Sequence, residues 1–266
     1  MKIALSFLIP IYNVEKFLPK CLSSVLNQNE PRCKYEIIMF DDQSKDNTFE
    51  IAKDFQSQYP DIVKAFQNPV NRGPAFSLNR SWEKSKHEYI FVLHADNELI
   101  DGSLSLLIDY ISSEGYQQGI VFGDIEYIDS SNNVFGSWSG KHLGQGHLSN
   151  ANLIKNYIDK DGSRFRPLQF IIDRKSMEKA GQWSEKYFLE DYDFTVRHLC
   201  TTEFHRVDQQ IVRFRDRPES HGHQPQIHAD SQMDVIEQYA EILQNKSGIN
   251  PKVFYTNTLC RIILMF

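Results

Sequence analysis

The stretch YEIIMFDDQSKDNT, residues 35–48, decides the fold. Residues 35–40 are mostly apolar, as expected for a buried strand, and they end at the carboxylates of Asp41 and Asp42. The polar turn at residues 43–47 leads into a segment whose apolar side chains recur at the spacing of one helix face. A buried strand that ends at acidic residues and continues into an amphipathic helix is typical of an α/β protein with a parallel sheet.

The same alternation extends over the first 115 residues. Three further apolar runs, residues 4–11, 62–66 and 89–93, are expected to be strands, and each is followed by a helical pattern, the first of them capped by Asn13. Strict alternation of strand and helix predicts parallel strands joined by right-handed crossovers, with ligands beyond their carboxyl ends. We therefore expect a site among the polar residues that follow three of the strands: Tyr12, Asn13, Asp42 and Asp96.

The second half of the chain alternates less regularly. A hairpin is expected around residues 129–133, and residues 140–146 form a glycine-rich loop that we expect to be flexible. Later strands are expected at 168–173 and 204–214, and later helices at 190–199 and 230–244. The sequence shows no internal repeat and no linker rich in Pro, Gly or Ser. It therefore predicts one α/β domain over residues 1–225, divided near residue 115, and a helical segment over residues 226–266.

The composition narrows the class of protein. Of 266 residues, 41% are hydrophobic, which is enough for a buried core, and 29 basic against 35 acidic residues give a net charge of −6. Such a charge argues against nucleic acid as a partner. The four cysteines show no Cys-x-x-Cys spacing and are expected to be reduced, as in a cytosolic protein. No run approaches the about 20 apolar residues of a membrane span, so the sequence indicates a cytoplasmic protein.

Both ends of the chain carry apolar runs. The run at residues 3–11 is interrupted by Pro10 and has no cleavage site after it, so we expect a first strand and not a signal peptide. Residues 259–266 are also markedly apolar. Three interpretations of this C-terminal run stay open: a packed terminal helix, peripheral contact with the inner face of a membrane, or the contact surface of a homodimer.

Several nucleotide- and ester-processing motifs are absent from the sequence. It contains no Gly-x-Gly-x-x-Gly after the first strand, no Gly-x-x-x-x-Gly-Lys-Ser/Thr loop and no Gly-x-Ser-x-Gly elbow. What remains is a set of acidic residues at strand ends. Carboxylates that hold a hard divalent cation are suited to binding a diphosphate.

Five short motifs carry a resemblance to a known family. They are PIYN at 10–13, DDQSKDNT at 41–48, NRG at 71–73, EYI to HADN at 88–97, and GQW to FLEDYDF at 181–194. In order and spacing they resemble family 2 glycosyltransferases over about residues 3 to 215. The resemblance implies the GT-A fold: a Rossmann-like, mostly parallel central sheet flanked by helices, with a smaller acceptor-side β/α region.

The resemblance also implies a reaction. A member of this family moves a sugar from a nucleotide diphosphate to an acceptor with inversion at the anomeric carbon. The donor half would be residues 1–115 and the acceptor half residues 116–225. The expected acceptor is a glycan or a lipid-linked acceptor, in the synthesis of a bacterial-type surface polysaccharide or glycolipid. The alternative is an inactive sugar-nucleotide-binding or scaffold protein of the same fold. A nucleotidyltransferase lacks support because its glycine- and lysine-rich loop is missing after the first strand.

The resemblance assigns the donor-binding residues. In this family the tyrosine of the first motif, here Tyr12, lies near the nucleotide base. The carboxylate that matches Asp42 accepts a hydrogen bond from the base. An aromatic face beside a hydrogen-bond acceptor favours uracil, so uridine diphosphate is the expected carrier. Pro10, Gly73 and His94 are expected to line the same donor site. Asp41 and Asp46, in contrast, are expected to be structural turn and helix-cap groups.

The metal site follows from the family's Asp-x-Asp motif, whose last carboxylate is Asp96 here. That carboxylate binds the Mn²⁺ or Mg²⁺ that bridges the two phosphates, and either His221 or His223 would complete the metal shell, unless both lie on a solvated surface loop. Arg215 is expected to pair with phosphate oxygens. The sequence departs from the family at His94, where an acid is usual, and at Leu78, where an arginine is common.

Asp191 is the catalytic residue that the resemblance implies. In an inverting transfer the acceptor hydroxyl loses its proton as the bond between sugar and phosphate breaks, and a carboxylate within hydrogen-bond reach serves as the base. Glu190 would lie beside Asp191 on the acceptor side, at a helix start where the dipole favours carboxylates. Asp193 is expected to be structural. The alternative for Glu190 and Asp191 is that they only cap this helix.

Overall fold

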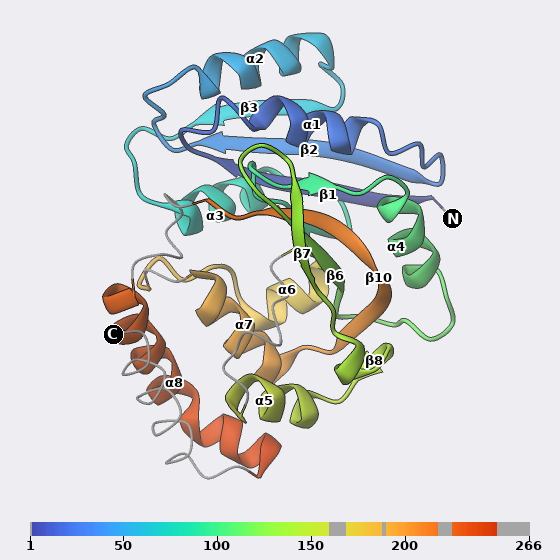
Figure 1. Ribbon diagram of the computed structural model, residues 1–266, viewed down its shortest axis with the longest axis vertical. Helices are drawn as coiled ribbons and strands as arrows, with labels where there is room; N and C mark the ends of the chain where they lie inside the picture. The colour runs from blue at the N-terminus through green and yellow to red at the C-terminus, as the bar shows by residue number, and fades with distance from the viewer. Residues whose placement is uncertain (1, 160–168, 188–189, 218–224, 249–266) are drawn as a thin grey trace.

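A computed structural model of the chain describes residues 2–159, 169–187, 190–217 and 225–248 (Figure 1). The strands of the first half are β1 (Ile3–Ile11), β2 (Cys33–Asp41), β3 (Val63–Gln67), β4 (Tyr89–Val92) and β5 (Glu98–Leu99). The helices of this half are α1 (Leu18–Leu26), α2 (Thr48–Gln58), α3 (Pro74–Lys84) and α4 (Ser103–Ile111). Strand β1 pairs in parallel with β2 and β4, and β2 pairs in parallel with β3. The alternation expected for the first 115 residues is confirmed.

The second half extends the same sheet. Its strands are β6 (Ile120–Ile128), β7 (Val134–Trp138), β8 (Gly146–Leu148), β9 (Phe170–Asp173) and β10 (Phe204–Arg215). Its helices are α5 (Asn150–Asp159), α6 (Arg174–Ala180), α7 (Glu190–Thr201) and α8 (Pro225–Ser247). The strand order is β3-β2-β1-β4-β9-β6-β10-β5, with β7 paired to β6 and β8 to β10. Strand β9 runs antiparallel between β4 and β6, and therefore joins the two halves into one mostly parallel central sheet.

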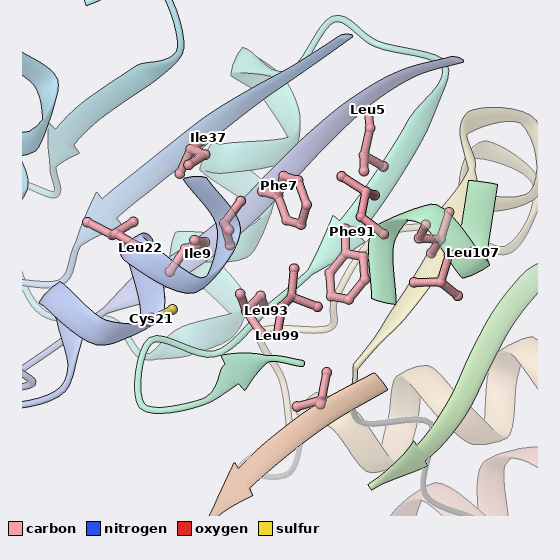
Figure 2. Close-up of a cluster of buried hydrophobic side chains, with 14 of the residues drawn as sticks. Leu5, Phe7, Ile9, Cys21, Leu22, Ile37, Phe91, Leu93, Leu99 and Leu107 are labelled. Atoms are coloured by element: carbon pink, nitrogen blue, oxygen red, sulfur yellow. The ribbon is translucent and has the colours of Figure 1, made fainter. Parts of the chain in front are cut away.

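Each face of the sheet is covered by its own apolar cluster. Side chains of β1 alternate between the faces, so Leu5, Phe7 and Ile9 pack on one side and Leu8 on the other. Helices α1, α2 and α4 cover the first face, where Phe7, Phe91 and Leu107 lie close together (Figure 2). Helices α3 and α5 to α8 cover the second face. A strand that is buried on both faces reads as a continuous apolar run, which is why the sequence located β1 so well.

One local expectation was wrong. Asn13 does not cap α1, because the residue at that cap is Phe17 and no side chain hydrogen-bonds there. Instead, the Asn13 side-chain oxygen accepts a hydrogen bond from the backbone N–H of Lys45 at 2.8 Å. Residues 140–146, which were expected to form a flexible loop, contain a 3₁₀ turn at Lys141–Leu143 and are hydrogen-bonded to Asp124 and Arg206; their flexibility stays a prediction. Buried charges that need partners recruit the backbone of this segment.

No helix in the described ranges combines the length and apolar composition of a membrane span. Helix α8 packs on the second-face cluster through Val235, Ile236 and Leu243. The C-terminal run 259–266, for which a membrane or dimer contact was considered, lies outside the described residues. His221 and His223 also lie outside them.

Candidate active site

The polar residues expected at three strand ends lie at one edge of the sheet. Strand β1 stands between β2 and β4, with Ile11 opposite Asp41 and Leu8 opposite Val92. The backbone N–H of Asp42 still donates to the carbonyl of Ile11, at 2.9 Å. Tyr12, which follows β1, is therefore flanked by Asp42 after β2 and by the His94–Asp96 segment after β4. This is the carboxyl edge of the parallel strands, where ligands of such sheets bind.

Asp42 is buried and binds the segment that opens α3. Its carboxylate accepts hydrogen bonds from the backbone N–H groups of Arg72 at 3.1 Å and Gly73 at 2.6 Å, and from the side-chain amide of Asn68 at 2.9 Å. Gly73 has a φ of +89°, a conformation that side chains with a Cβ adopt only with strain. The Asn-Arg-Gly motif is thus the partner of Asp42, and its glycine permits the turn into the helix.

The loops after β1 and β2 bind each other. The N–H of Asn13 donates to the Ser44 hydroxyl at 3.0 Å, while the N–H of Lys45 donates to the Asn13 side chain. Tyr12 is 41% exposed on this fixed backbone, and Pro10 beside it is partly buried. A largely exposed aromatic ring on an ordered loop is available to stack against a planar ligand.

Asp41 and Asp46 make local contacts. The carboxylate of Asp41 accepts from the N–H of Ser44 at 3.0 Å and from the Gln67 amide at 2.9 Å. That of Asp46 accepts from the N–H of Thr48 at 3.0 Å, at the start of α2, and its pKa is lowered by such hydrogen bonds against the opposing effect of burial. These contacts agree with the expectation that both residues are structural.

Asp96 lies in the turn after β4 with its carboxylate partly enclosed. Its Oδ2 is 2.7 Å from the Nη2 of Arg217, and 16% of the Asp96 side chain is exposed. His94, two residues earlier, is fixed by its backbone, because its N–H donates to the side-chain oxygen of Gln169 at 3.1 Å. Gln169 precedes β9, so the antiparallel strand that joins the two halves also supports this turn.

Arg215 is buried behind Asp96. Its guanidinium donates to the carbonyl of Asp96 at 2.9 Å and to the carboxylate of Glu98 at 2.7 Å. The same group donates to the carbonyl of Asp129 and the side chain of Asn132, both at 2.7 Å. Arg215 therefore connects the turn of the β6–β7 hairpin to the Asp96 turn. Figure 1 shows this hairpin reaching toward α1 and β1. Its expected contact with phosphate stays a prediction.

The described residues contain no group of three His, Cys, Asp or Glu side chains placed to hold a metal ion. Asp96 offers one carboxylate, which forms an ion pair with the guanidinium of Arg217. The residues therefore fit a divalent cation only if a second oxygen donor, such as a diphosphate, shares it. Leu78, at the family's arginine position, is buried in the core, and the nearby Arg80 pairs with Glu83 at 2.8 Å.

The first turn of α7 holds three carboxylates in different surroundings. Asp191 is exposed, whereas Asp193 is buried and accepts from the guanidinium of Arg197 at 2.9 Å, as expected for a structural residue. Burial, together with the neighbouring Asp191 carboxylate, raises the pKa of Glu190 to about 8. Glu190 therefore keeps its proton to higher pH than an ordinary carboxyl group does, and Asp191 is the exposed carboxylate of this turn.

Side-chain contacts connect the segment before α7 to the carboxyl edge of the parallel strands. Asn79 on α3 donates to the carbonyl of Trp183 at 2.9 Å and accepts from the N–H of Trp183 at 3.1 Å. Arg72, whose N–H binds Asp42, pairs with Glu185 at 2.6 Å. The segment that leads into α7 is thus bound to the helix that begins at Gly73. Sequence reasoning missed Asn79, Glu185 and Gln169, because their partners lie 75 to 113 residues away along the chain.

Comparison with known proteins supports a family assignment. The sequence model of Glycosyl transferase family 2 matches residues 6–180. A relative from Campylobacter jejuni, GalNAc(5)-diNAcBac-PP-undecaprenol beta-1,3-glucosyltransferase, is 28% identical over 186 residues, which cover 69% of this chain and 56% of the relative. This chain spans 19%, 56% and 46% of the first three curated relatives it matches.

Two solved structures illustrate the likeness in fold. Residues 1–349 of S. aureus TarS, in complex with UDP-GlcNAc, superpose with a TM-score of 0.72 at 16% identity, over 99% of this chain and 72% of that one. The mannosyltransferase PcManGT from Pyrobaculum calidifontis, in complex with GDP-Man and Mn²⁺, superposes with a TM-score of 0.65 at 13% identity, over 98% of this chain and 75% of that one. The GT-A fold expected from the sequence is confirmed.

Proposed function

The chain belongs to glycosyltransferase family 2, and we propose that it transfers a sugar from a uridine diphosphate donor to a glycan or lipid-linked acceptor with inversion at the anomeric carbon. One observation carries the proposal: the exposed ring of Tyr12 is flanked, at one sheet edge, by Asp42 and Asp96. An aromatic face, a buried acceptor and a partly exposed carboxylate are the groups that a base, its N–H and a diphosphate-bound cation require.

The donor would lie along this edge with its base on Tyr12 and beside Asp42. The Asp42 carboxylate already accepts from three protein N–H donors, and a carboxylate has about four acceptor positions, so one remains for the uracil N–H. Pro10 and Gly73 border the base, and His94 lies toward the sugar. The UDP-GlcNAc bound by TarS, which shares the fold, supports a uridine-linked donor.

Asp96 would hold a divalent cation jointly with the diphosphate, and His221 or His223 would complete its shell. When bound, such a cation neutralises the charge that develops on the leaving diphosphate. Arg215 holds the carbonyl of Asp96, and so fixes the position of this carboxylate. The Mn²⁺ in the complex of PcManGT, another protein of this fold, supports the choice of metal.

Asp191 would accept the proton of the attacking hydroxyl. The acceptor oxygen forms a bond to the anomeric carbon, the bond between that carbon and the phosphate oxygen breaks, and the hydroxyl proton passes to the carboxylate. Asp191 is the suitable carboxylate of its turn because it is exposed, whereas Asp193 is bound to Arg197 and the pKa of Glu190 is raised. The undecaprenol-linked substrate in the name of the Campylobacter relative supports a lipid-linked acceptor in surface polysaccharide synthesis.

The proposal is tested with a panel of UDP- and GDP-sugars, incubated with Mn²⁺ and with glycan or undecaprenyl-linked acceptors, while nucleotide release and product mass are measured. We expect turnover of a UDP-sugar. If no donor is turned over under any condition, while UDP still binds, the chain is a binding protein and the proposed transfer is wrong.

A single substitution tests the base. Asp191→Asn should lower transfer by about 10²-fold or more, as the loss of a general base does, with UDP affinity unchanged. Asp54→Asn on the exposed face of α2 removes the same charge and should leave transfer unchanged. Loss of UDP binding in Asp191→Asn would contradict its assignment as base.

A further inference from the structure

Arg217 is paired with the carboxylate that the proposed function assigns to a divalent cation. Its Nη2 lies 2.7 Å from Oδ2 of Asp96, and the two side chains are only 21% and 16% exposed. An ion pair enclosed to this degree is screened less by water and salt than a pair on the open surface. The negative charge of Asp96 is therefore already neutralised by a side chain of the protein, the guanidinium of Arg217.

The ring of Phe17, at the start of α1, holds this guanidinium in place. The Cζ of Arg217 lies 5.3 Å from the ring centroid, and that of Arg215 lies 4.8 Å from it. Arginines attract the negative face of an aromatic ring. Arg215 is fixed there by its hydrogen bonds to Asp96, Glu98 and the hairpin turn. Arg217 thus lies beside an immobile like charge, where the Asp96 carboxylate offsets the repulsion.

A divalent cation that arrived alone would meet unfavourable surroundings. The cation would have to break the Arg217–Asp96 pair and would then lie near two guanidinium groups. A nucleotide diphosphate changes this balance, since it supplies further oxygen ligands, brings negative charge and offers Arg217 another anionic partner.

We propose that Arg217 is a positioning residue that neutralises Asp96 until a nucleotide diphosphate arrives, so that the cation enters with the nucleotide and not before it. This inference rests on the proposed function, in which Asp96 is a metal ligand. It adds an order of binding: the protein's own cation holds the carboxylate in the empty enzyme, and the diphosphate exchanges that partner for the metal.

Mn²⁺ binding without nucleotide tests the proposal directly. Free Mn²⁺ is measured by electron paramagnetic resonance during titration of the wild type and of Arg217→Gln. Because the substitution removes one competing charge, we expect Mn²⁺ to bind about tenfold more tightly to the variant. In the absence of metal, UDP should bind about tenfold more weakly to the variant, as calorimetry will show, because one phosphate partner is lost.

Three further variants make the outcome specific. Arg213→Gln removes the same charge from the end of β10, four residues before Arg217, but from a partly exposed pair with Glu126 at 2.7 Å, so both affinities should stay at wild-type values. Arg217→Lys keeps the charge and should resemble the wild type. In Arg217→Gln combined with Asp96→Asn, the gain in Mn²⁺ affinity should disappear. Thermal melting of each variant checks that it is folded.

The opposite results separate this inference from the proposed function. Equal or weaker Mn²⁺ binding by folded Arg217→Gln overturns the inference, even if the wild type transfers sugar in a metal-dependent way. A gain of affinity that persists in the double variant also overturns it, because the cation would then be bound elsewhere. An enzyme that turns over no donor, yet shows the gain and its loss in the double variant, would contradict the proposed transfer alone.

Discussion

The carboxylate of Asp42 accepts a hydrogen bond from the backbone N–H of Gly73 at 2.6 Å, across 31 residues of sequence. This contact joins the end of β2 to the start of α3. The same carboxylate also binds the N–H of Arg72, whose guanidinium pairs with Glu185 in the segment that leads to α7. One buried acidic side chain thereby connects the carboxyl edge of the parallel strands to the segment before α7, the helix that carries the proposed base.

Replacing this carboxylate should damage both stability and nucleotide binding. In Asp42→Asn an N–H₂ group takes the place of one acceptor, so one of the N–H donors to Asp42 loses its partner, at a cost of about 1–3 kcal/mol in the free energy of unfolding. Urea denaturation measures that loss, and calorimetry should show UDP binding weakened by about tenfold, the value of one hydrogen bond to a charged group. Asp61→Asn, at an exposed position, is the control. Unchanged UDP affinity in a folded variant would contradict the assigned role.

Gly73 should be intolerant of a side chain because of its backbone, not because of crowding. A Cβ at this position would meet nothing within 4 Å, but the φ of +89° is unfavourable for other residues. Gly73→Ala is therefore expected to lower the free energy of unfolding by about 1–2 kcal/mol. Gly115→Ala, whose Cβ would meet only the Ser113 hydroxyl at 3.9 Å, should cost much less. Equal losses in the two variants would rule out backbone strain as the cause.

The buried pair of Arg206 and Asp124 should dominate the stability of the second half. Arg206 is 1% exposed and makes three hydrogen bonds to the Asp124 carboxylate, at 2.8, 2.9 and 3.0 Å. Arg206→Met leaves that carboxylate without its charged partner, so we expect a loss of about 3–5 kcal/mol in urea denaturation. Arg213→Met, which breaks the more exposed pair with Glu126, should cost no more than about 1 kcal/mol. A small loss in Arg206→Met would show that solvent reaches Asp124.

Glu190 should make stability fall as the pH rises. Burial and Asp191 raise its pKa from 4.5 to about 8, so the folded state keeps a proton that the unfolded state has lost. Between these two pKa values the folded state binds more protons, and stability therefore decreases with increasing pH. The contribution is fully present below pH 4.5 and is lost as the pH passes 8. Denaturation of wild type and Glu190→Gln across this range measures it, since the variant has no such group; parallel pH profiles would contradict it.

The parallel half could be predicted from sequence because its signals are local. Strands buried on both faces are continuous apolar runs, and the strand-end residues Tyr12, Asp42 and Asp96 follow those runs directly. The edge of the sheet at which they lie follows from the parallel topology alone. The position of Asp191 came from a family resemblance, since nothing in its neighbourhood distinguishes a base from a helix cap.

The rest depended on contacts that no local pattern encodes. Strand β9 runs antiparallel between β4 and β6, with Phe170 opposite Val92. The residue pattern of neither segment predicts which strand it pairs with. Arg215 was expected to pair with phosphate oxygens, and no local pattern indicates that its side chain is buried, since charged residues are usually exposed. Its burial became possible only because Asp96, Glu98 and the hairpin turn supply acceptors around it. Helices α5 and α6 were missed altogether.

The bond between Arg215 and the β6–β7 hairpin turn limits how this enzyme can be modified. A hairpin at the edge of an active site is an obvious module to exchange between relatives when a new acceptor is wanted. Replacing this hairpin would remove the Asn132 side chain and the Asp129 carbonyl, which both accept hydrogen bonds from Arg215. Arg215 would then no longer be held in place to bind the Asp96 turn. Under the proposed function, a chimera that keeps these two hairpin acceptors should therefore retain the position of the Asp96 turn, and with it nucleotide binding.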